Sequence, residues 1–335
     1  MISTSTRPLL EVKDLCVDYL AERGAVRAVD HVSLELRKGE FLGIVGESGC
    51  GKSTLLYAIA NLLTPPAEIT SGDIWFEGKD MVSMAESELR HLRWKQYSVV
   101  MQSAMNALNP VMTIGEQLRD AIAAHDDLSA AETDRLCAYV MRMVGIDPVH
   151  LGSYPHQLSG GMRQRAMIAM ALVFQPELVI MDEPTSALDV VAQRSLMVQI
   201  KSLQREIGFA AIFVTHDMSL VSHFSDRLLV MYAGQVAEFG DTRRVFDTPR
   251  HPYTRALLEA FPSIRGPKTH LLGIPGAPPD LARPPVGCRF SPRCPVARAT
   301  CYATPPRLVE VDGDLVRCVL YDDAAVARDP VAAES

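Results

Sequence analysis

The chain has no long hydrophobic run and no excess of positive charge. Its longest apolar stretch, residues 166–174, is far shorter than the about 18 residues of a membrane-spanning helix. The first eight residues lack the apolar core of a secretory signal, which predicts a protein made and kept in the cytosol. The 33 basic and 40 acidic residues give a net charge of −7, and no basic run interleaved with aromatics appears. We therefore expect no membrane span and no nucleic-acid partner.

The chain has 335 residues, more than the about 100–200 of a typical single domain. This length predicts a main domain with an appendage. The clearest motif lies near the start, between an apolar strand at residues 41–45 and a helix that follows. It fits a glycine, four residues, then Gly-Lys-Ser, and consists of Gly46, Glu47, Ser48, Gly49, Cys50, Gly51, Lys52 and Ser53, followed by Thr54.

A glycine-rich turn between a strand and a helix can cradle phosphates. Its backbone N–H groups point inward around an anion, and the helix N-terminus adds partial positive charge. Lys52 can then reach the β and γ phosphates, and the Ser53 hydroxyl can bind Mg²⁺. A glycine-rich turn without ligand is the plainer alternative, but the flanking strand and helix favour a nucleoside triphosphate site.

Two alternating segments, residues 9–19 and 26–36, predict an antiparallel sheet beside the cradle. Tyr19 lies in the first of them. Its ring either packs in the sheet or lies against an adenine ring, and periodicity leaves both open.

Polar residues end three apolar strands later in the chain. Gln102 follows residues 99–101, Asp182 and Glu183 follow residues 178–181, and His216 follows residues 210–215. The carboxyl ends of parallel strands form one ligand-binding edge, so we expect these side chains to gather there. Asp182 is suited to bind Mg²⁺, and Glu183 is suited to act as a base that polarises water. For Gln102 and His216 a structural role is the plainer alternative, because a loop glutamine or a strand-end histidine is more often structural.

Helices are expected at residues 84–97 and 115–145, with a capping-box start at Ser129. A further apolar helix runs to residue 174 and begins after Ser159, Gly160 and Gly161, which can again form an anion site, a weak signal by itself. Asp189 ends a turn after the Asp182–Glu183 pair.

The order of these motifs resembles the ATP-binding subunit of an ATP-binding cassette (ABC) transporter over residues 9–240. The resemblance implies an α/β P-loop NTPase with a RecA-like core and parallel sheet, an antiparallel β subdomain, and a helical subdomain at about residues 103–165. It also implies roles for single residues: Tyr19 stacks on adenine, residues 46–54 bind ATP, Ser53, Gln102 and Asp182 hold Mg²⁺, and Glu183, His216 and Gln102 are catalytic. Ser159, Gly160 and Gly161 form the signature and Asp189 the D-loop.

The signature departs from the family pattern at Met162, where glutamine is usual. This is tolerable if Ser159 and the glycine amides bind the phosphate. The resemblance further implies that two cassettes meet head to tail, so that one chain cannot complete a site. A homodimer and a heterodimer both stay open.

Residues 241–321 form a proline- and cysteine-rich extension, whose proline-rich segments at 274–281 and 284–288 we expect to run across a surface. With residues 107–110, it resembles the oligopeptide/dipeptide importer group. That resemblance implies two membrane permeases, an external solute-binding protein, and a peripheral place on the cytoplasmic face of a bacterial or archaeal inner membrane. Peptides are the expected cargo, with nickel or oligosaccharides as alternatives. Residues 1–8 and 322–335 are expected to be flexible.

The extension contains four cysteines, the number of ligands that an Fe–S cluster or a structural zinc site requires: Cys288, Cys294, Cys301 and Cys318. In a reducing compartment they indicate metal rather than disulfides. Their spacing fits neither common pattern, and four metal-free thiols are the plainer alternative. Some peptide-importer relatives carry a [4Fe-4S] cluster on such a tail, so the resemblance favours Fe–S over zinc.

Two rival functions belong to other classes. One is a soluble ABC ATPase acting on ribosomes or DNA, which usually has two cassettes in one chain or a long coiled-coil insertion. The other is a metal or redox sensor built on the cysteines, whose ATPase activity would follow the state of the cluster.

Overall fold

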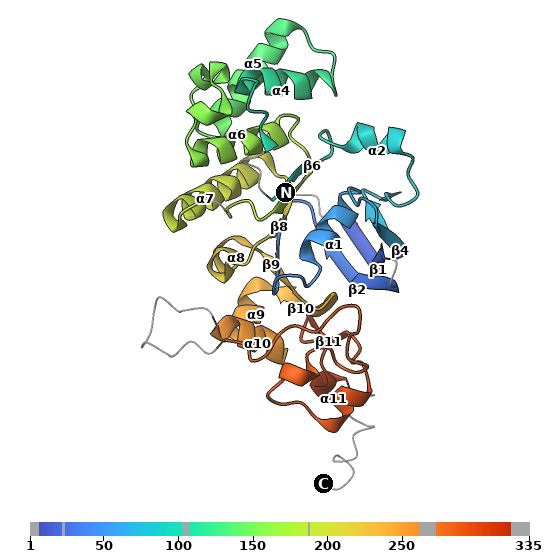
Figure 1. Cartoon of the computed structure of the whole chain (residues 1–335). Helices are drawn as coiled ribbons and strands as arrows, with labels where there is room; N and C mark the ends of the chain where they lie inside the picture. Colours follow the sequence, from blue (N-terminus) through green and yellow to red (C-terminus); the bar gives the residue numbers. More distant parts are fainter. Residues whose placement is uncertain (1–6, 22–23, 103–106, 187, 261–272, 323–335) are drawn as a thin grey trace. The chain divides into compact units, whose positions relative to one another are not determined.

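The structure is a computed structural model that describes residues 7–21, 24–102, 107–186, 188–260 and 273–322 (Figure 1). The chain forms two compact units, each built from several segments. The first unit comprises residues 1–10, 36–41 and 76–215, and the second comprises residues 11–35, 42–75 and 216–335.

Three parallel strands form the sheet of the first unit: β6 (Tyr97–Val100), β7 (Leu178–Asp182) and β8 (Ala210–Val214). Every residue of β7 and β8 is buried. Parallel strands that are covered on both faces have continuous apolar sequences, as β7 and β8 do. The strands expected from the apolar runs before Glu183 and His216 are confirmed. The register pairs Val100 with Met181 and Asp182 with Val214, which aligns the carboxyl ends of the strands.

The helices of the first unit are α2 (Glu86–Leu92), α4 (Ile114–Ala123), α5 (Ala130–Met143), α6 (Gly160–Leu172) and α7 (Val190–Ile207), with short 3-10 turns at Pro148–Gly152 and Pro155–Gln157 and the short strand β5 (Lys79–Asp80). The expected helix at residues 84–97 is shorter, and the expected helix at 115–145 is two helices. The capping box predicted at Ser129 is confirmed at the start of α5, where its hydroxyl accepts the Glu132 N–H. Part of the expected helical subdomain, residues 103–106, lies outside the described residues.

The second unit holds a mixed sheet. Strand β3 (Phe41–Val45) pairs in parallel with β9 (Arg227–Tyr232), and β9 pairs antiparallel with β10 (Gln235–Asp241). Strand β12 (Asp314–Val316) then pairs antiparallel with β10 and with β11 (Val309–Val311). The extension therefore adds strands to the sheet at residues 309–316, whereas its proline-rich residues 274–288 form no helix or strand and are mostly exposed. Strands of three residues are too short to show a recognisable alternation of apolar and polar residues.

A second sheet in this unit has β1 (Leu10–Ala21) between β2 (Gly24–Leu36) and β4 (Ala67–Phe76). The two strands expected at residues 9–19 and 26–36 are confirmed as neighbours. The helix after the glycine-rich loop, α1, spans Lys52–Ile59.

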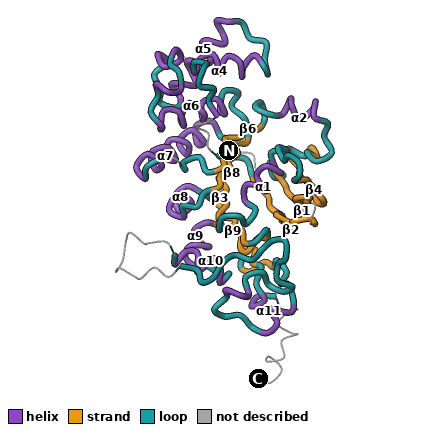
Figure 2. Tube along the Cα trace, viewed as in Figure 1, coloured by secondary structure: helices purple, strands orange, loops and turns teal. Residues whose placement is uncertain are grey.

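The rest of the second unit contains α8 (Met218–Phe224), α9 (Thr242–Asp247), α10 (Pro252–Glu259), α11 (Ala299–Ala303) and 3-10 turns at Ser291–Arg293 and Val319–Tyr321. Figure 2 shows residues 273–322 mostly as loops. An aromatic cluster anchors these loops: the Phe290 ring lies 5.2 Å from Tyr232 of β9 and 5.4 Å from Tyr253 of α10. All three side chains are buried, so the loop-rich extension has an apolar anchor.

The end of the extension is held by an ion pair. Arg307 donates through Nη2 to Asp322 at 2.7 Å, and Asp322 is 2% exposed. The folded extension thus includes Asp322, which we had assigned to a flexible tail. The remainder of that tail, residues 323–335, lies outside the described residues, as do residues 1–6.

The buried His251 makes stability depend on pH. Its Nδ1 accepts the Tyr253 N–H at the start of α10, and burial lowers its pKa from the ordinary 6.5 to about 4. The unfolded chain therefore binds more protons between these values, so stability falls as pH drops through that window. We expect His251 to account for a loss of about 2 kcal/mol of unfolding free energy between about pH 7 and about pH 5.

The measurement is denaturant unfolding of the native chain and of His251→Asn at both pH values. Asparagine keeps an acceptor for the cap but does not titrate, so the variant should lose less stability on acidification. His223→Asn on the exposed face of α8 is the matched control. Equal acid sensitivity in His251→Asn and the native chain would contradict the assignment.

Candidate functional site

The glycine-rich loop joins β3 to α1 in a shape that side chains do not permit. Gly46 has φ of 152°, and a Cβ there would lie 2.2 Å from the Met231 oxygen. Gly51 has φ of 100°, and a Cβ there would lie 2.1 Å from the Ala28 oxygen. Both positions therefore require glycine, because the loop is pressed against backbone on two sides. The predicted turn is confirmed as a tightly wrapped loop at the start of a helix.

Lys52 is the first residue of α1 and is 8% exposed. Its ammonium group donates to the backbone oxygens of Gly46 and Glu47 at 2.8 and 2.9 Å. These bonds hold the positive charge inside the curve of the loop, beside the N-terminal N–H groups of α1. A cation, a helix N-terminus and a glycine loop together form the donor set that a polyphosphate needs.

The Tyr19 side chain is 36% exposed, so it is not part of the sheet core. Its hydroxyl lies 3.2 Å from the hydroxyl of Thr54 in α1. The structure thus brings Tyr19 to the helix that follows the loop. Stacking of its ring on adenine stays a prediction.

At the carboxyl edge of the first unit, the structure brings together Gln102 and Glu183. Gln102 Nε2 donates to Glu183 Oε2 at 3.0 Å. The preceding residue of β7, Asp182, is 0% exposed, so a fully buried carboxylate lies next to this pair. Buried carboxylates are costly unless they bind hydrogen-bond donors or cations, which fits a metal shell.

The backbone at Glu183 is left-handed, with φ of 47°, and its N–H donates to the Val214 oxygen at 3.0 Å. A non-glycine residue in this region costs about 1–3 kcal/mol, and such strain concentrates at functional sites. His216 follows β8 by two residues and is exposed, but it belongs to the second unit. Its predicted approach to Glu183 stays a prediction.

The signature residues begin α6. Ser159 is exposed and caps the helix, with its hydroxyl accepting the Met162 N–H at 3.3 Å. Nothing lies within 4 Å of the position that a Cβ on Gly161 would take. The first turn of α6 is therefore open, as an anion site requires. Asp189 likewise caps α7, accepting the Ala192 N–H at 2.8 Å, so it has a structural role whatever else it does.

Four thiols of the extension lie near one another. Burial, with a smaller effect of the neighbouring thiols, raises the pKa of Cys318 to about 12, and burial raises the pKa of Cys288 to about 11. Backbone N–H groups point at these sulfurs: Phe290 and Ser291 toward Cys288, Val296 toward Cys294, Leu320 toward Cys318, and Arg298 toward Cys301. Without a cation the most buried thiols therefore stay protonated at neutral pH, and a metal would replace those protons.

A different trio of possible metal ligands escaped the sequence analysis. Among the residues that the structure describes, Cys16, Asp30 and His31 have ligand atoms within 4.8 Å of one another. Asp30 already pairs with Arg289 at 2.7 Å and lies 3.6 Å from Arg27. Two guanidinium groups leave little charge for a metal, so this trio stabilises the β1–β2 region instead.

Sequence analysis also missed two residues of the extension that contact the phosphate loop. Arg293 pairs with the Glu47 carboxylate, and the Tyr253 hydroxyl accepts the Glu47 N–H. More than 200 residues separate each of them from Glu47, and no motif spacing connects them.

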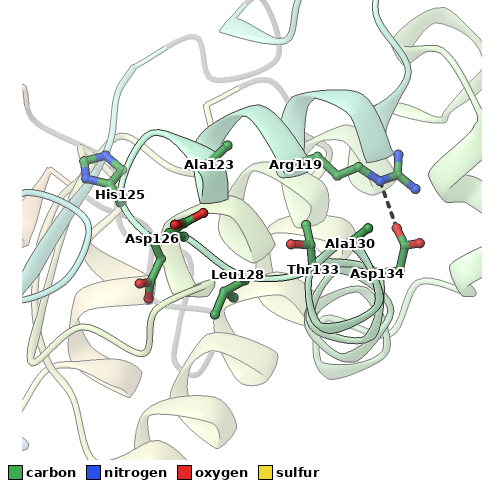
Figure 3. A pocket seen from close by; sticks show the side chains of 9 residues that line it. Arg119, Ala123, His125, Asp126, Leu128, Ala130, Thr133 and Asp134 are labelled. Atoms are coloured by element: carbon green, nitrogen blue, oxygen red, sulfur yellow. Dashed lines mark hydrogen bonds and ion pairs between the residues drawn. The ribbon is translucent and has the colours of Figure 1, made fainter.

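The helical part of the first unit has a cavity of about 590 Å³, lined from α4 to α5. Figure 3 shows Arg119 of α4 pointing toward Asp134 of α5, and the two form an ion pair of 2.9 Å. Asp126 and Asp127 also line it, so acidic groups outnumber the one arginine. The acidic lining of this cavity would repel the phosphates of a nucleotide. Within the described residues, none of the helices has the length and apolar character to cross a bilayer.

Comparisons with known proteins agree with this geometry. Residues 29–186 match the family model of the ABC transporter, and residues 237–301 match the model of the oligopeptide/dipeptide transporter C-terminal region. An AAA domain model also matches residues 152–222, which include the signature and β7.

The relatives share almost the full length of the chain. The dipeptide transport ATP-binding protein of Bacillus subtilis is 42% identical, covering 95% of this chain and 96% of its own. The oligopeptide transport ATP-binding protein of Escherichia coli is 43% identical, covering 95% and 97%. A solved dimeric ATP-binding cassette in a post-hydrolysis state, bound to ADP and Pi, is 28% identical with a TM-score of 0.62, covering 70% of this chain and 99% of its own.

The loop, the strand edge and these likenesses define an ATP-binding cassette of the P-loop ATPase class. Within that class, the chain belongs to the family of dipeptide and oligopeptide transport ATP-binding proteins.

Lys52 tests the cradle directly. Lys52→Ala removes the ammonium group beside the loop carbonyls, so ATP affinity should fall by about tenfold or more. Isothermal titration with ATP measures the change. Lys38→Ala is the matched control, because Lys38 pairs with Glu77 and Glu177 in the first unit. Native ATP affinity in Lys52→Ala would contradict the phosphate cradle.

Proposed function

We propose that the chain binds and hydrolyses ATP to energise import of dipeptides and oligopeptides through partner permeases. The observation that carries the proposal is the Gln102–Glu183 hydrogen bond at the end of β7, next to the buried Asp182. ATP hydrolysis needs a water-aligning carboxylate as well as a phosphate cradle, and Glu183 would supply it in this ABC-family chain.

The glycine-rich loop of the second unit and Tyr19 would bind ATP. Lys52 and the first N–H groups of α1 would bind the phosphates of ATP, and the partly exposed Tyr19 ring would lie on the adenine. Ser53, Gln102 and Asp182 would hold Mg²⁺, since hydroxyl, amide and carboxylate oxygens are its preferred ligands. When bound, the ion neutralises charge on the transferred phosphoryl group.

Glu183 would accept hydrogen bonding from the attacking water and turn it toward the γ-phosphate. The bond from Gln102 Nε2 to Oε2 helps to fix the direction of the Glu183 carboxylate. His216 would contact the γ-phosphate from the start of α8. Release of the cleaved phosphate would remove that contact and favour reopening.

A second cassette would complete each site. The open first turn of α6, with Ser159, Gly160 and Gly161, would bind the phosphates of ATP held by the partner cassette, and Asp189 would lie at the same interface. The dimeric assembly of the similar solved cassette supports this arrangement. The partner is a copy of this chain or a similar subunit.

The remaining partners follow from the relatives' names, which specify dipeptide and oligopeptide transport. We infer two permeases and an external solute-binding protein, with this chain peripheral at the cytoplasmic face of a bacterial or archaeal membrane. Nickel and oligosaccharides are the alternative cargoes. The soluble ribosome- or DNA-remodelling function has no feature of the described residues in its favour.

Glu183→Gln tests hydrolysis and transport together. The variant keeps the shape and an oxygen acceptor for Gln102 but loses the carboxylate, so ATP should bind while ATPase activity falls by about a hundredfold or more. Sedimentation should show a dimer trapped by ATP. In cells with the partner permeases, uptake of labelled dipeptide should stop.

Glu177→Gln is the matched control, because Glu177 is a surface carboxylate paired with Lys38. It should leave ATPase activity and uptake unchanged. Unaltered ATP turnover in Glu183→Gln would remove this residue from the mechanism. Uptake of nickel or an oligosaccharide but not of peptide would replace the cargo.

We further propose that Cys288, Cys294, Cys301 and Cys318 hold a [4Fe-4S] cluster, with one zinc ion as the alternative. Buried thiols that receive backbone N–H groups suit a metal cluster, whose charge these groups stabilise. Its role would be structural.

Metal analysis of protein purified without oxygen tests this proposal. We expect about four irons per chain and a broad visible absorbance, both lost in Cys288→Ser/Cys294→Ser. Cys137→Ser, a buried cysteine of α5, is the control and should keep the iron. One zinc without colour would support the alternative, and metal-free protein would overturn both.

A further inference from the structure

The C-terminal extension is bonded to the phosphate loop at one residue, Glu47. All the residues concerned belong to the second unit. The Arg293 guanidinium forms two parallel bonds to the Glu47 carboxylate, Nη1 to Oε2 at 2.6 Å and Nη2 to Oε1 at 2.9 Å. A paired fork of this kind fixes direction as well as distance.

The Arg293 side chain is itself held on every nitrogen. It is 4% exposed, and Nε donates to the Pro275 oxygen at 2.7 Å. Nη1 also lies 3.2 Å from the Tyr232 hydroxyl, and Nη2 lies 3.4 Å from the Ile274 oxygen. Glu47 raises the pKa of Arg293, so the group stays charged. A buried guanidinium with this many hydrogen-bond partners is held in one orientation.

Tyr253 of α10 fixes the backbone of the same loop residue. Its hydroxyl accepts the Glu47 N–H at 2.9 Å, and its ring is 0% exposed. The ring lies 5.4 Å from Phe290, three residues before Arg293. The side chain and the backbone of Glu47 are thus both held by residues outside the cassette motifs.

Glu47 in turn supports Lys52, the lysine of the phosphate cradle. The Lys52 ammonium donates to the oxygens of Gly46 and Glu47, the two residues at the start of the loop. Movement of Glu47 therefore moves the acceptor that positions Lys52. Misplacement by about 1 Å at such a site is enough to weaken function strongly.

The segment that carries Arg293 is part of the four-thiol loop. Arg293 ends the turn Ser291–Arg293 and precedes Cys294, and its N–H donates to the Phe290 oxygen at 3.0 Å. The neighbouring Cys288 N–H donates to the Cys301 oxygen at 2.7 Å. The position of Arg293 thus depends on the fold of the thiol loop.

We propose that Arg293 is a positioning residue of the ATP site: through Glu47 it sets the shape of the phosphate loop and makes ATP affinity depend on the folded extension. This inference rests on the proposed binding of ATP at the cradle, and it holds whichever metal the thiols bind. Arg293 does not touch the reacting atoms, so its loss acts on binding.

The test compares ATP binding by the full chain and by Arg293→Lys, which keeps the charge but cannot form the fork. We expect the dissociation constant and the KM for ATP to rise about tenfold, with kcat changed by less than about twofold. Isothermal titration and steady-state ATPase assays measure these quantities. Arg307→Lys is the matched control, since its fork to Asp322 lies in the same extension, and it should leave ATP affinity unchanged.

A second background separates positioning from general destabilisation. In Glu47→Gln the carboxylate is absent, so Arg293→Lys should add little further loss of ATP affinity. An equal loss in both backgrounds, or native affinity in Arg293→Lys, would overturn the proposal. If the native chain itself fails to bind ATP while remaining folded, the proposed function fails first, and the two failures are thereby distinguished.

Discussion

The approach of two backbone carbonyls to the glycine-rich loop constrains the rest of this structure. The oxygens of Met231 and Ala28 lie where a Cβ of Gly46 or Gly51 would be. The loop therefore follows a path that glycine alone permits. Lys52 can lie inside that curve because the carbonyls of Gly46 and Glu47 accept its protons. Strand β3, helix α1 and strand β9 all serve to hold this shape.

The first unit applies the same logic to acidic groups. The residues within parallel strands that are buried on both faces are apolar. The polar residues Gln102, Asp182 and Glu183 therefore lie at or just beyond the carboxyl ends of the strands. The left-handed backbone at Glu183 is a local cost that the buried strands on either side can support. A rigid sheet thus presents a strained, hydrogen-bonded carboxylate in a fixed direction.

The extension shows how a loop-rich segment becomes part of a functional unit. It has few regular elements, but the rings of Tyr232, Tyr253 and Phe290 pack together and β12 joins β10. Because these contacts bury the Arg293 guanidinium, its charge must be satisfied, and Glu47 supplies the carboxylate. A proline-rich, loop-rich segment therefore contacts the phosphate loop directly.

The sequence alone determined the features that depend on local order. The turn of residues 46–53, the apolar strands that end in Asp182 and Glu183, and the cap at Ser129 each require neighbouring residues in a fixed spacing, so pattern predicts them. Tertiary structure alone decided the bond of Gln102 to Glu183, the added strands β11 and β12, and the grip of Arg293 and Tyr253 on Glu47. These contacts join residues that are far apart in the chain. They depend on burial and charge in the folded protein, so no fixed sequence spacing predicts them.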